Sequence, residues 1–324
     1  MLTQKKGIYC LGHITLDIFI HRSDLNKLRI GGQIESQELG VYGGGCDANV
    51  SFWLGILKNQ VSLTGVIAND PAGNFLRTEL ERANVKCHLK HSKKYPTATI
   101  LIIVEPDGER SFIRNGECLN DLEWEDLSLE YILNSSLFYT SAYTLESLPI
   151  KETVKRIFHT IRKNEPSEPL TMLNLAAYTT VERRRSEIEA AILPYTSILV
   201  GNRDEFDVLV NNSSNKIKKS NFEIAKKICD NFPNLKTILI TLGASGCFYY
   251  SENNHGHIPT NQISVVDTTG AGDGFCAGFI DGYLAGKNIE QAVKQGVNLG
   301  TQICQGFGAR FNASKFSFRN KTGM

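Results

Sequence analysis

The chain has 324 residues, of which 41% are hydrophobic and 21% charged, a globular composition that excludes disordered, collagenous and coiled-coil chains. Its 35 Lys and Arg residues balance 34 Asp and Glu residues, and a net charge of +1 argues against a protein that binds nucleic acid or an anionic membrane. No stretch approaches the roughly 20 apolar residues that span a bilayer. Eight singly placed cysteines, with no CxxC pair, predict neither a zinc site nor a redox motif, and they suit the reducing cytoplasm, where we expect the protein.

Strand-like and helix-like patterns alternate along most of the chain. Apolar, β-branched runs predict strands at 8–11, 61–66, 99–104, 136–140, 170–175, 197–200, 237–241 and 263–266. Amphipathic segments between many of them predict helices at 48–57, 72–83, 150–163, 184–192 and 222–231. This alternation indicates an α/β fold with a mostly parallel central sheet covered by helices on both faces, and we expect residues 1–324 to form one domain.

Two segments interrupt the alternation. Residues 19–41 alternate polar and apolar side chains with no helix between them, and residues 96–117 predict a hairpin that turns at 106–109. Both patterns favour antiparallel strands outside the main sheet. Because ligands bind at the carboxyl edge of open α/β sheets, we expect these two segments to form a small β lid over that edge.

The most informative segment is 263–275, where a predicted strand meets three closely spaced glycines and then a helix. Glycines permit positive φ and let a ligand approach the backbone closely. Amides that open a helix have no intrahelical partner and favour an anion. One carboxylate, that of Asp273, lies in the same turn.

A carboxylate inside an anion site repels a phosphate in its ground state. The combination is useful if Asp273 takes a proton from a substrate hydroxyl while the amides stabilise charge on a transferring phosphoryl group. The turn therefore predicts phosphoryl transfer with Asp273 as general base and Gly270, Ala271 and Gly272 as the anion hole. The alternative is an aspartate that only caps a glycine-rich helix.

Two rival motifs can be checked directly. Gly272-x-Gly274-x-x-Ala277 matches the GxGxxG/A pattern of dinucleotide-binding folds, which would indicate a dehydrogenase. No second strand ending in an acidic residue follows at about 20 residues, as that pattern requires. The GxxxxGK[ST] pattern of a P-loop is absent from the sequence. We therefore discount both.

The run Asp267-Thr-Thr-Gly-Ala-Gly-Asp273 resembles the carboxyl-terminal signature of the ribokinase-like (PfkB) carbohydrate and nucleoside kinases. Seven adjacent positions match, in the expected strand–turn–helix context. The resemblance continues in the same order over nearly the whole chain, in motifs similar to the family's opening strand (Gly12 with Asp17), its GGxxxN (44–49), its NxxE (Asn202 with Glu205) and its TxGxxG (241–246). It implies a ribokinase-like fold with ATP and Mg²⁺ as cofactors.

The resemblance also implies a role for each motif. Substrate hydroxyls are implied at Asp17, Gly44, Gly45 and Asn49. Nucleotide contacts are implied at Asn202, Thr241, Gly243 and Gly246. Glu205 is implied to hold Mg²⁺, directly or through water, as suits a hard cation that prefers oxygen ligands. Asp267 and Thr269, with carbonyls in 306–310, are implied to hold a monovalent cation such as K⁺.

Residue chemistry alone leaves alternatives open at several of these positions. Asp17 suits sugar hydroxyls if it is buried, but it could equally be an exposed aspartate at a strand end. Asn49 could cap a helix after a flexible loop. Asn202 and Glu205 also fit the first and fourth positions of a capping box. Asn298, a weaker candidate for a nucleotide contact, also fits a half-exposed helical position.

We therefore expect an ATP- and Mg²⁺-dependent kinase that phosphorylates a hydroxyl of a small polyol. A sugar is the first choice of acceptor, on the polar set Asp17, Asp47 and Asn49. A nucleoside is the alternative, because Asn174 and the segment 107–115 resemble the adenosine-kinase branch. A catalytically silent binding protein of the same fold is a further alternative, against which Asp273 argues. Exposed lid strands can pair between subunits, so a homodimer is also an expectation.

Overall fold

The computed structural model describes residues 7–21, 29, 31–33, 38–104, 110–162, 169–210, 219–252 and 254–310. The turn predicted at 106–109 and most of 22–37 lie outside these residues. Within the described part of the chain, none of the helices combines the length and the apolar character needed to cross a membrane.

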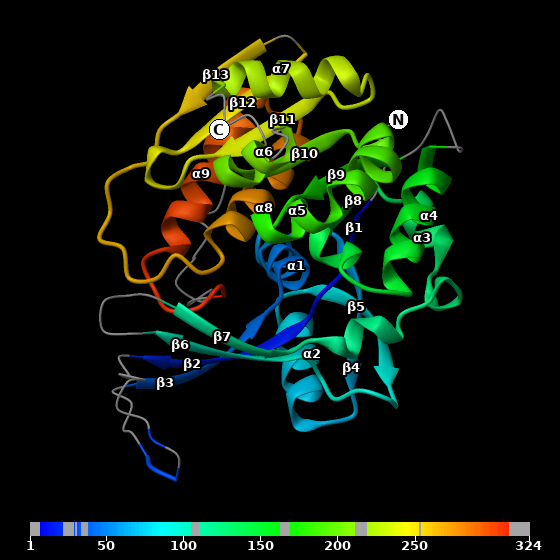
Figure 1. The fold of residues 1–324 in the computed structure, drawn as a ribbon, viewed down its shortest axis with the longest axis vertical. Coiled ribbons are helices and arrows are strands. Elements are labelled where there is room, and N and C mark those ends of the chain that lie inside the picture. The colour runs from blue at the N-terminus through cyan, green and yellow to red at the C-terminus, as the bar shows by residue number, and fades with distance from the viewer. Residues whose placement is uncertain are drawn as a thin grey trace, which may run out of the picture.

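The large sheet runs through the middle of the molecule (Figure 1). In the described residues its strand order is β13-β12-β11-β10-β9-β8-β1-β4-β5. Neighbouring strands are parallel from β11 to β5, while β12 and β13 are antiparallel. The bounds are β1 Ile8–Leu11, β4 Val61–Ala68, β5 Val85–Ser92, β8 Leu137–Ser141, β9 Leu170–Asn174, β10 Ile198–Asn202, β11 Thr237–Thr241, β12 Cys247–Ser251 and β13 Asn254–Ile258. The prediction of a mostly parallel sheet is confirmed.

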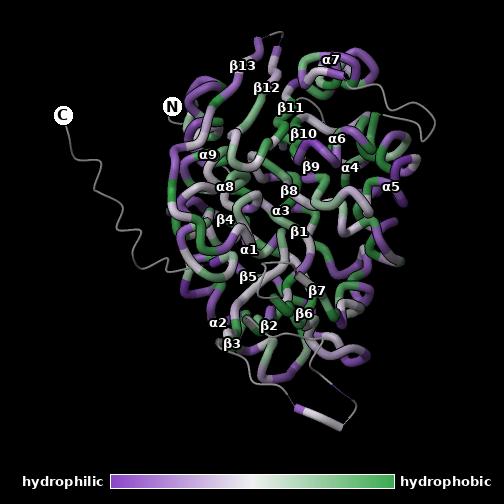
Figure 2. The backbone as a smooth tube through the Cα atoms, turned by 60° about the vertical axis from the view of Figure 1, so that its left-hand side comes forward, coloured by the Kyte–Doolittle hydropathy of each residue, from purple (hydrophilic) through white to green (hydrophobic). Residues whose placement is uncertain are grey.

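Helices cover both faces of this sheet, because alternate strand residues point to opposite sides. Ile8 and Cys10 of β1 pack with α1 (Cys46–Ile56), α2 (Pro71–Arg82), α8 (Ala271–Leu284) and α9 (Ile289–Ile303). Tyr9 and Leu11 pack on the other face with α3 (Leu129–Leu133), α4 (Ile150–Arg162), α5 (Tyr178–Glu187), α6 (Arg203–Val210) and α7 (Asn221–Asn231). Figure 2 shows hydrophobic residues concentrated along the strands between these two helical layers.

The small sheet has the order β3-β2-β6-β7, with bounds β2 Thr15–His21, β3 Glu38–Gly44, β6 Thr99–Val104 and β7 Arg110–Asn115. β2 pairs antiparallel with β3 and parallel with β6, and β6 pairs antiparallel with β7. β1 leads almost directly into β2, which places the small sheet at the carboxyl edge of the large one. Of the segments 19–41 and 96–117, residues 19–21, 38–41, 99–104 and 110–115 form strands outside the main sheet, as expected.

The large sheet has a topological switch point at β1. The chain adds β4 and β5 on one side of β1, then β8 to β11 on the other. In open α/β sheets, ligands bind outside the carboxyl ends of the strands at such a point. The carboxyl ends of β1 and β8 therefore mark where a site is expected.

The predicted strand at 263–266 is wrong, because these residues form no strand. Val265 and Val266 are 58% and 46% exposed, and the amide of Val266 donates to the carbonyl of Cys304 (2.8 Å) rather than to a neighbouring strand. The β-branched content that suggested a strand reflects an irregular segment that crosses the carboxyl edge and lines a cavity.

Candidate active site

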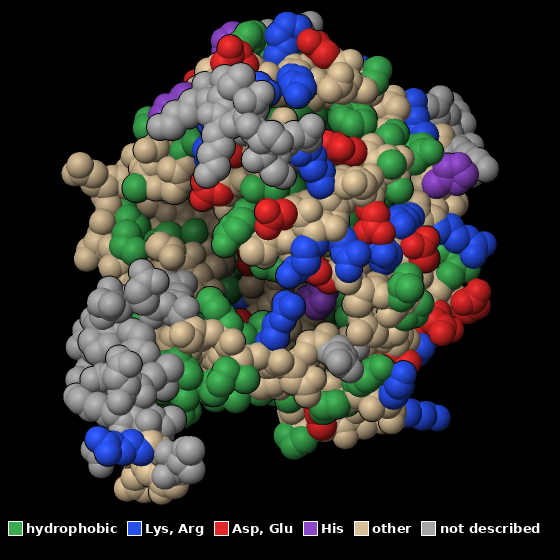
Figure 3. Space-filling model, viewed as in Figure 1, with side chains coloured by type: hydrophobic (Ala, Val, Ile, Leu, Met, Phe, Trp, Pro, Cys, Tyr) green, Lys and Arg blue, Asp and Glu red, His purple; other side chains and the backbone are tan. Residues whose placement is uncertain are grey.

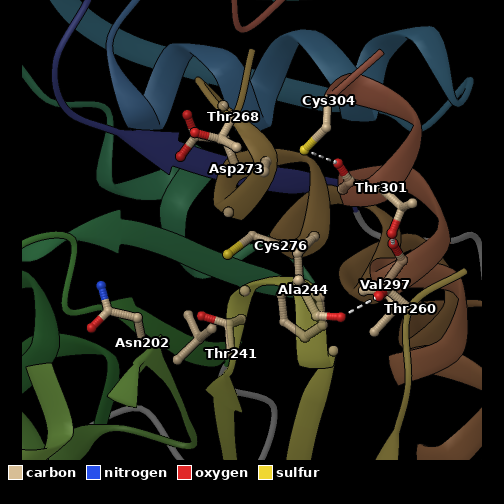
Figure 4. Close-up of a pocket in the computed structure, with 18 of the residues that line it drawn as sticks. Asn202, Thr241, Ala244, Thr260, Thr268, Asp273, Cys276, Val297, Thr301 and Cys304 are labelled. Atoms are coloured by element: carbon tan, nitrogen blue, oxygen red, sulfur yellow. Dashed lines mark hydrogen bonds between the residues drawn. The ribbon is translucent and has the colours of Figure 1, made fainter. Parts of the chain in front are cut away.

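A cavity of about 740 Å³ opens at the carboxyl edge of the large sheet, beside the hollow that separates it from the small sheet (Figure 3). It is lined by the ends of β9, β10 and β11, by the irregular segment 260–265, by the start of α8 and by one side of α9. Figure 4 shows Asp273 and Cys276 on α8, Thr241 on β11 and Val297 with Thr301 on α9 around this space. The cavity is therefore built from segments that are far apart in the sequence.

The start of α8 leaves backbone amides facing the cavity. Gly270 is the N-cap with a left-handed φ of 78°, and its carbonyl accepts the first helical hydrogen bond from the amide of Gly274 (2.8 Å). The amide of Ala271, which we expected in the anion hole, donates instead to the carbonyl of Thr268 (3.2 Å). The amides of Gly272 and Asp273 are the next two and have no intrahelical acceptor. A Cβ added at Gly272 would meet no atom within 4 Å, so a ligand can approach these amides closely.

Asp273 is buried, with 7% of its surface exposed. One carboxylate oxygen accepts a hydrogen bond from Nδ2 of Asn49 (2.7 Å), and the Cys46 thiol also bonds to the carboxylate. Burial raises the pKa of Asp273 to about 6, although the bonds from Asn49 and Cys46 and the charge of Arg310 lower it in part. A carboxyl group with this pKa is suited to accept and return a proton near neutral pH.

Asp17 of β2 approaches the same region from the small sheet. It is 7% exposed and accepts a hydrogen bond from Oγ1 of Thr15 (2.7 Å), and burial raises its pKa. A Cβ added at Gly44 would collide with the Asp17 carboxylate, so the glycine leaves room for this side chain. Gly45 is the N-cap of α1 and lies against the carbonyl of His13. These glycines therefore pack against protein groups, whereas we expected them to let a ligand approach.

No role in the site was predicted for the side chain of Arg310. Its side chain is 1% exposed and forms an ion pair with Glu79 of α2. Its Nε donates to Oδ1 of Asn49 (2.9 Å), and Nη2 donates to the carbonyl of Gly44 (2.8 Å). Next to Asp273, Arg310 thus connects α1 and α2, which cover the large sheet, to β3 of the small sheet. No pattern near Arg310 in the sequence indicates these partners.

Asn202 and Glu205 form the expected capping box. The amide of Asn202 donates to Oε2 of Glu205 (2.8 Å), and the amide of Glu205 donates to Oδ1 of Asn202 (2.9 Å). Nδ2 of Asn202 also donates to Oε1 of Glu205 (2.7 Å). Burial raises the pKa of Glu205 to about 7. Both residues line the cavity, so the capping role does not remove them from the site.

The other nucleotide candidates separate into two groups. Thr241, Gly243 and Gly246 line the cavity where β11 turns into β12, and Oγ1 of Thr241 donates to the carbonyl of Gly201 (3.2 Å). Asn298 is exposed, and α9 contributes Val297, Gly300, Thr301 and Cys304 to the cavity instead. These four residues share one face of α9, at the spacing of a helical period, and Asn298 points to a different face. Asn298 therefore lies outside the cavity.

Asp267 connects the glycine turn to the segment after α9. Its Oδ1 accepts from the amide and Oγ1 of Thr269 (3.0 and 2.8 Å), and Oδ2 accepts from the amide of Gly308 (2.9 Å). The carboxylate therefore stabilises this junction whether or not a cation binds.

Asp47 and Asn174 are held by protein groups. Asp47 is fully buried at the switch point, where its carboxylate accepts from the amide of His13 (3.0 Å) and from the amide and hydroxyl of Ser141 (2.8 and 2.9 Å). Its expected place among the acceptor ligands is wrong, because the side chain has no exposed surface that an acceptor could reach. Asn174 lines the cavity, donates to the hydroxyl of Tyr139 (3.1 Å) and accepts from the amide of Ala176 (3.1 Å).

A mostly parallel α/β sheet with a second small sheet, and a buried carboxylate beside the amides of a helix start, is the arrangement expected of a small-molecule phosphotransferase. The pfkB family carbohydrate kinase model matches residues 5–315. The chain belongs to this family and is a kinase.

Named relatives agree with the family. The chain is 27% identical to ribokinase from Dictyostelium discoideum over 301 residues, which cover 88% of this chain and 89% of that protein. Adenosine kinase from Sinorhizobium meliloti has the same fold, with a TM-score of 0.82 and 22% identity over 95% of this chain and 96% of that one. An E. coli protein solved in complex with ATP and Mg²⁺ aligns with a TM-score of 0.79 and 18% identity over 94% of each chain.

Proposed function

We propose that this kinase transfers the γ-phosphoryl group of ATP to a hydroxyl of a sugar, with Asp273 as the general base. The observation that carries the proposal is the position of Asp273. It lies at the start of α8 beside free amides, lines the large cavity and bonds to Asn49, which connects it to the small-sheet side where Asp17 lies. The cavity takes ATP, and the acceptor occupies the hollow between the two sheets (Figure 3).

In this mechanism Asp273 accepts the proton of the acceptor hydroxyl as its oxygen attacks the γ-phosphorus in line with the leaving ADP. The amides of Gly272 and Asp273 donate to the phosphoryl oxygens, where negative charge develops. Asp17 and Asn49 orient the acceptor through its other hydroxyls. The small sheet closes over the acceptor and excludes water, which would otherwise take the phosphoryl group.

The residues present fit Mg²⁺ bound through water. Both oxygens of Glu205 already accept hydrogen bonds from Asn202, and each carboxylate oxygen retains a second lone pair for a metal-bound water. When bound, Mg²⁺ neutralises charge on the ATP phosphates. Asn202, Thr241, Gly243 and Gly246 would contact the nucleotide at the ends of β10 and β11.

The acceptor class is best supported as a sugar by the buried polar pair Asp17 and Asn49 and by the carbohydrate-kinase family. A nucleoside is the second candidate, supported by the adenosine kinase of the same fold and by the position of Asn174 in the cavity. A sugar acceptor and a nucleoside acceptor both need the same base and the same phosphoryl donor.

The experiment that tests this proposal is an acceptor panel. Purified protein is incubated with ATP and Mg²⁺ and with sugars or nucleosides one at a time, and ADP is measured. A sugar that accelerates ADP release and is recovered as its phosphate supports the proposal. Phosphorylation of nucleosides alone would overturn the sugar assignment, and ADP release that no acceptor increases would overturn the kinase mechanism.

Four further features belong to the proposal. We propose that the whole chain acts as one kinase domain with the small sheet as its lid, and that two chains pair through the outer face of that sheet. The cytoplasmic location is supported by the eight cysteines, all of them free.

We also propose that Asp267 and Thr269 bind K⁺. Replacing KCl with tetramethylammonium chloride tests this, because activity should fall if the cation is required.

A further inference from the structure

Arg310 lies at the centre of the acceptor side of the site. It approaches Asn49 of α1, Gly44 of β3 and Glu79 of α2 with three different nitrogens. Three other contacts anchor the segment that carries it. The indole of Trp53 donates to the carbonyl of Ala309 (2.8 Å), the amide of Gly308 donates to Asp267, and Gly308 packs against Tyr42. The backbone near Arg310 is therefore held independently of the guanidinium.

The contact with Asn49 determines which way the Asn49 amide points. A guanidinium can only donate hydrogen bonds, so the atom of Asn49 that faces Nε must be its oxygen. Nδ2 then faces Asp273, to which it donates (2.7 Å). If the amide turned over, its oxygen would face a carboxylate oxygen, and neither could donate. Arg310 thus selects the orientation in which Asn49 stabilises ionised Asp273.

The charge of Arg310 acts in the same direction as this bond. Asp273 lies among titratable groups from several elements, namely Asp17 of β2, Asp47 and Cys46 of α1, Tyr139 of β8, Tyr143 just after β8 and Cys276 of α8. The carboxylate of Asp17 raises the pKa of Asp273, whereas the positive charge of Arg310 lowers it. A base in such surroundings needs a nearby cation to remain ionised near neutral pH.

We propose that Arg310 is a positioning residue that holds Asn49 in the orientation that binds Asp273 and keeps this base ionised. The inference rests on the proposed function, because it takes Asp273 as the base. The inference goes beyond the proposed function by assigning the activation of the base to a residue that follows α9 and touches no reacting atom.

The test compares Arg310→Met, Arg310→Lys and the control Glu79→Gln. Glu79→Gln removes the ion-pair partner on α2 but leaves Nε and Asn49 in place. The first readout is the pKa of Asp273, followed through the ¹³C carboxyl shift of labelled aspartate and assigned with Asp273→Asn. The second is the pH dependence of kcat with the acceptor found in the panel.

We expect Arg310→Met to raise the pKa of Asp273 by at least about one unit, as loss of a nearby opposite charge does. The acidic limb of kcat should move upward by the same amount. For a shift of one unit, kcat at pH 6 should then fall roughly fivefold, because the ionised fraction of Asp273 drops from about one half to about one tenth, and kcat at neutral pH should fall less. Arg310→Lys should keep the limb near its wild-type position but lower kcat, because lysine retains the charge without the fixed geometry of the guanidinium. Glu79→Gln should change neither readout.

An unchanged Asp273 pKa in Arg310→Met would overturn the inference. A Glu79→Gln variant in which the Asp273 pKa rises as much as expected for Arg310→Met would also overturn it. If the methionine variant does not fold, the lysine variant decides, since wild-type kcat there would exclude a role for the guanidinium geometry. The carboxyl titration needs no acceptor, so a protein that phosphorylates nothing would overturn the proposed function while the titration still tests the role of Arg310.

Discussion

Two aspartates of the glycine turn have different roles, although they are six residues apart. Asp267 accepts three hydrogen bonds from protein groups and connects two segments. Asp273 has fewer donors, is buried beside Asp17, and has a pKa raised to about 6. The number of donors around each carboxylate therefore separates a structural aspartate from a catalytic candidate, and the motif in the sequence contains both without distinguishing them.

Two glycines of the same turn offer a matched pair of substitutions. Gly270→Ala should reduce the free energy of unfolding by more than the roughly 1–2 kcal/mol that a left-handed alanine costs. The reason is that φ is 78° and the new Cβ would also lie 2.5 Å from Cβ of Ala309. Gly272→Ala should change stability by less than about 0.5 kcal/mol, because its Cβ points into open space. Urea denaturation of both variants measures the difference.

The activities should show the opposite order. The new methyl group of Gly272→Ala would displace the phosphoryl group by about 1 Å. A misplacement of that size lowers the rate roughly 100-fold, so kcat should fall by about this factor while the protein remains folded. A Gly272→Ala variant with wild-type kcat would mean that the phosphoryl group does not approach this amide.

Asp17 provides a test of the acceptor site. Asp17→Ala removes a buried carboxylate on the small sheet, so KM for the acceptor should rise roughly 10- to 100-fold, the usual worth of hydrogen bonds to a charged group. KM for ATP should stay unchanged, because Asp17 is not among the residues that line the cavity proposed to hold ATP. Steady-state kinetics with each substrate varied in turn measures both constants, and an equal rise in both would make Asp17 structural.

The sequence predicted Asp273, Asn49 and Glu205 because each lies in a short local pattern. It could not predict Arg310, whose partners Asn49 and Glu79 are 261 and 231 positions away. It placed Asp47 with the acceptor because Asp47 lies next to a glycine motif, and the sequence does not show which groups the carboxylate contacts. Only the pairing of β1 with β8 places the donors of His13 and Ser141 around it.

At the scale of elements, strands were predicted well where a segment with the right residue pattern also pairs with a neighbouring strand. β6 and β11 have the predicted bounds, 99–104 and 237–241. The segment 263–266 is similarly rich in β-branched residues, but the amide of Val266 bonds to Cys304 at the end of α9 and the segment forms no strand. Local propensity is a weak guide when the tertiary partner is missing.

The small sheet is expected to behave as a lid. Its edge strands β3 and β7 carry exposed side chains, such as Leu39, Val41 and Phe112, so local opening should cost little free energy. Amides in β2, β3, β6 and β7 should therefore exchange with deuterium faster than those in the central strands β4 and β11. Addition of an active acceptor should slow exchange in the small sheet, because closure orders it. Hydrogen exchange with mass spectrometry measures this.

ATP alone is the control for this experiment. It should protect the cavity-lining ends of β10 and β11 and leave the small sheet largely unchanged. Protection of the small sheet that no acceptor alters would make it a rigid part of the fold, and water would then be excluded by another segment.

At the scale of the molecule, the switch point at β1 brings the site together. Strand addition on both sides of β1 places α1, the small sheet and the start of α8 around one crevice. The alternation of strands and helices in the sequence predicts the layers of this fold. It does not predict the strand order, which depends on contacts between distant segments.

The outer face of the small sheet is expected to form a dimer interface. Val41, Ile18, Leu101 and Ile113 lie opposite one another across its four strands, on the face away from Asp17. Val41 and Ile113 are 48% and 62% exposed. Sedimentation should therefore show a dimer, and Val41→Lys combined with Ile113→Lys should shift it to monomer by placing charges in an apolar interface. A wild-type monomer at all concentrations tested would contradict the interface.

The central claim, that Asp273 is the base of a phosphoryl transfer, is tested most directly by the pH dependence of kcat in the wild type and in Asp273→Asn. The base must be ionised to accept a proton, so wild-type kcat should fall as the pH drops through about 6, the pKa to which burial raises Asp273. Asp273→Asn should bind ATP and acceptor normally but turn over at least about 100-fold more slowly, without this acidic limb. Glu205→Gln should keep the limb even if it is slower. An Asp273→Asn variant with near-normal turnover and the same limb would contradict the account.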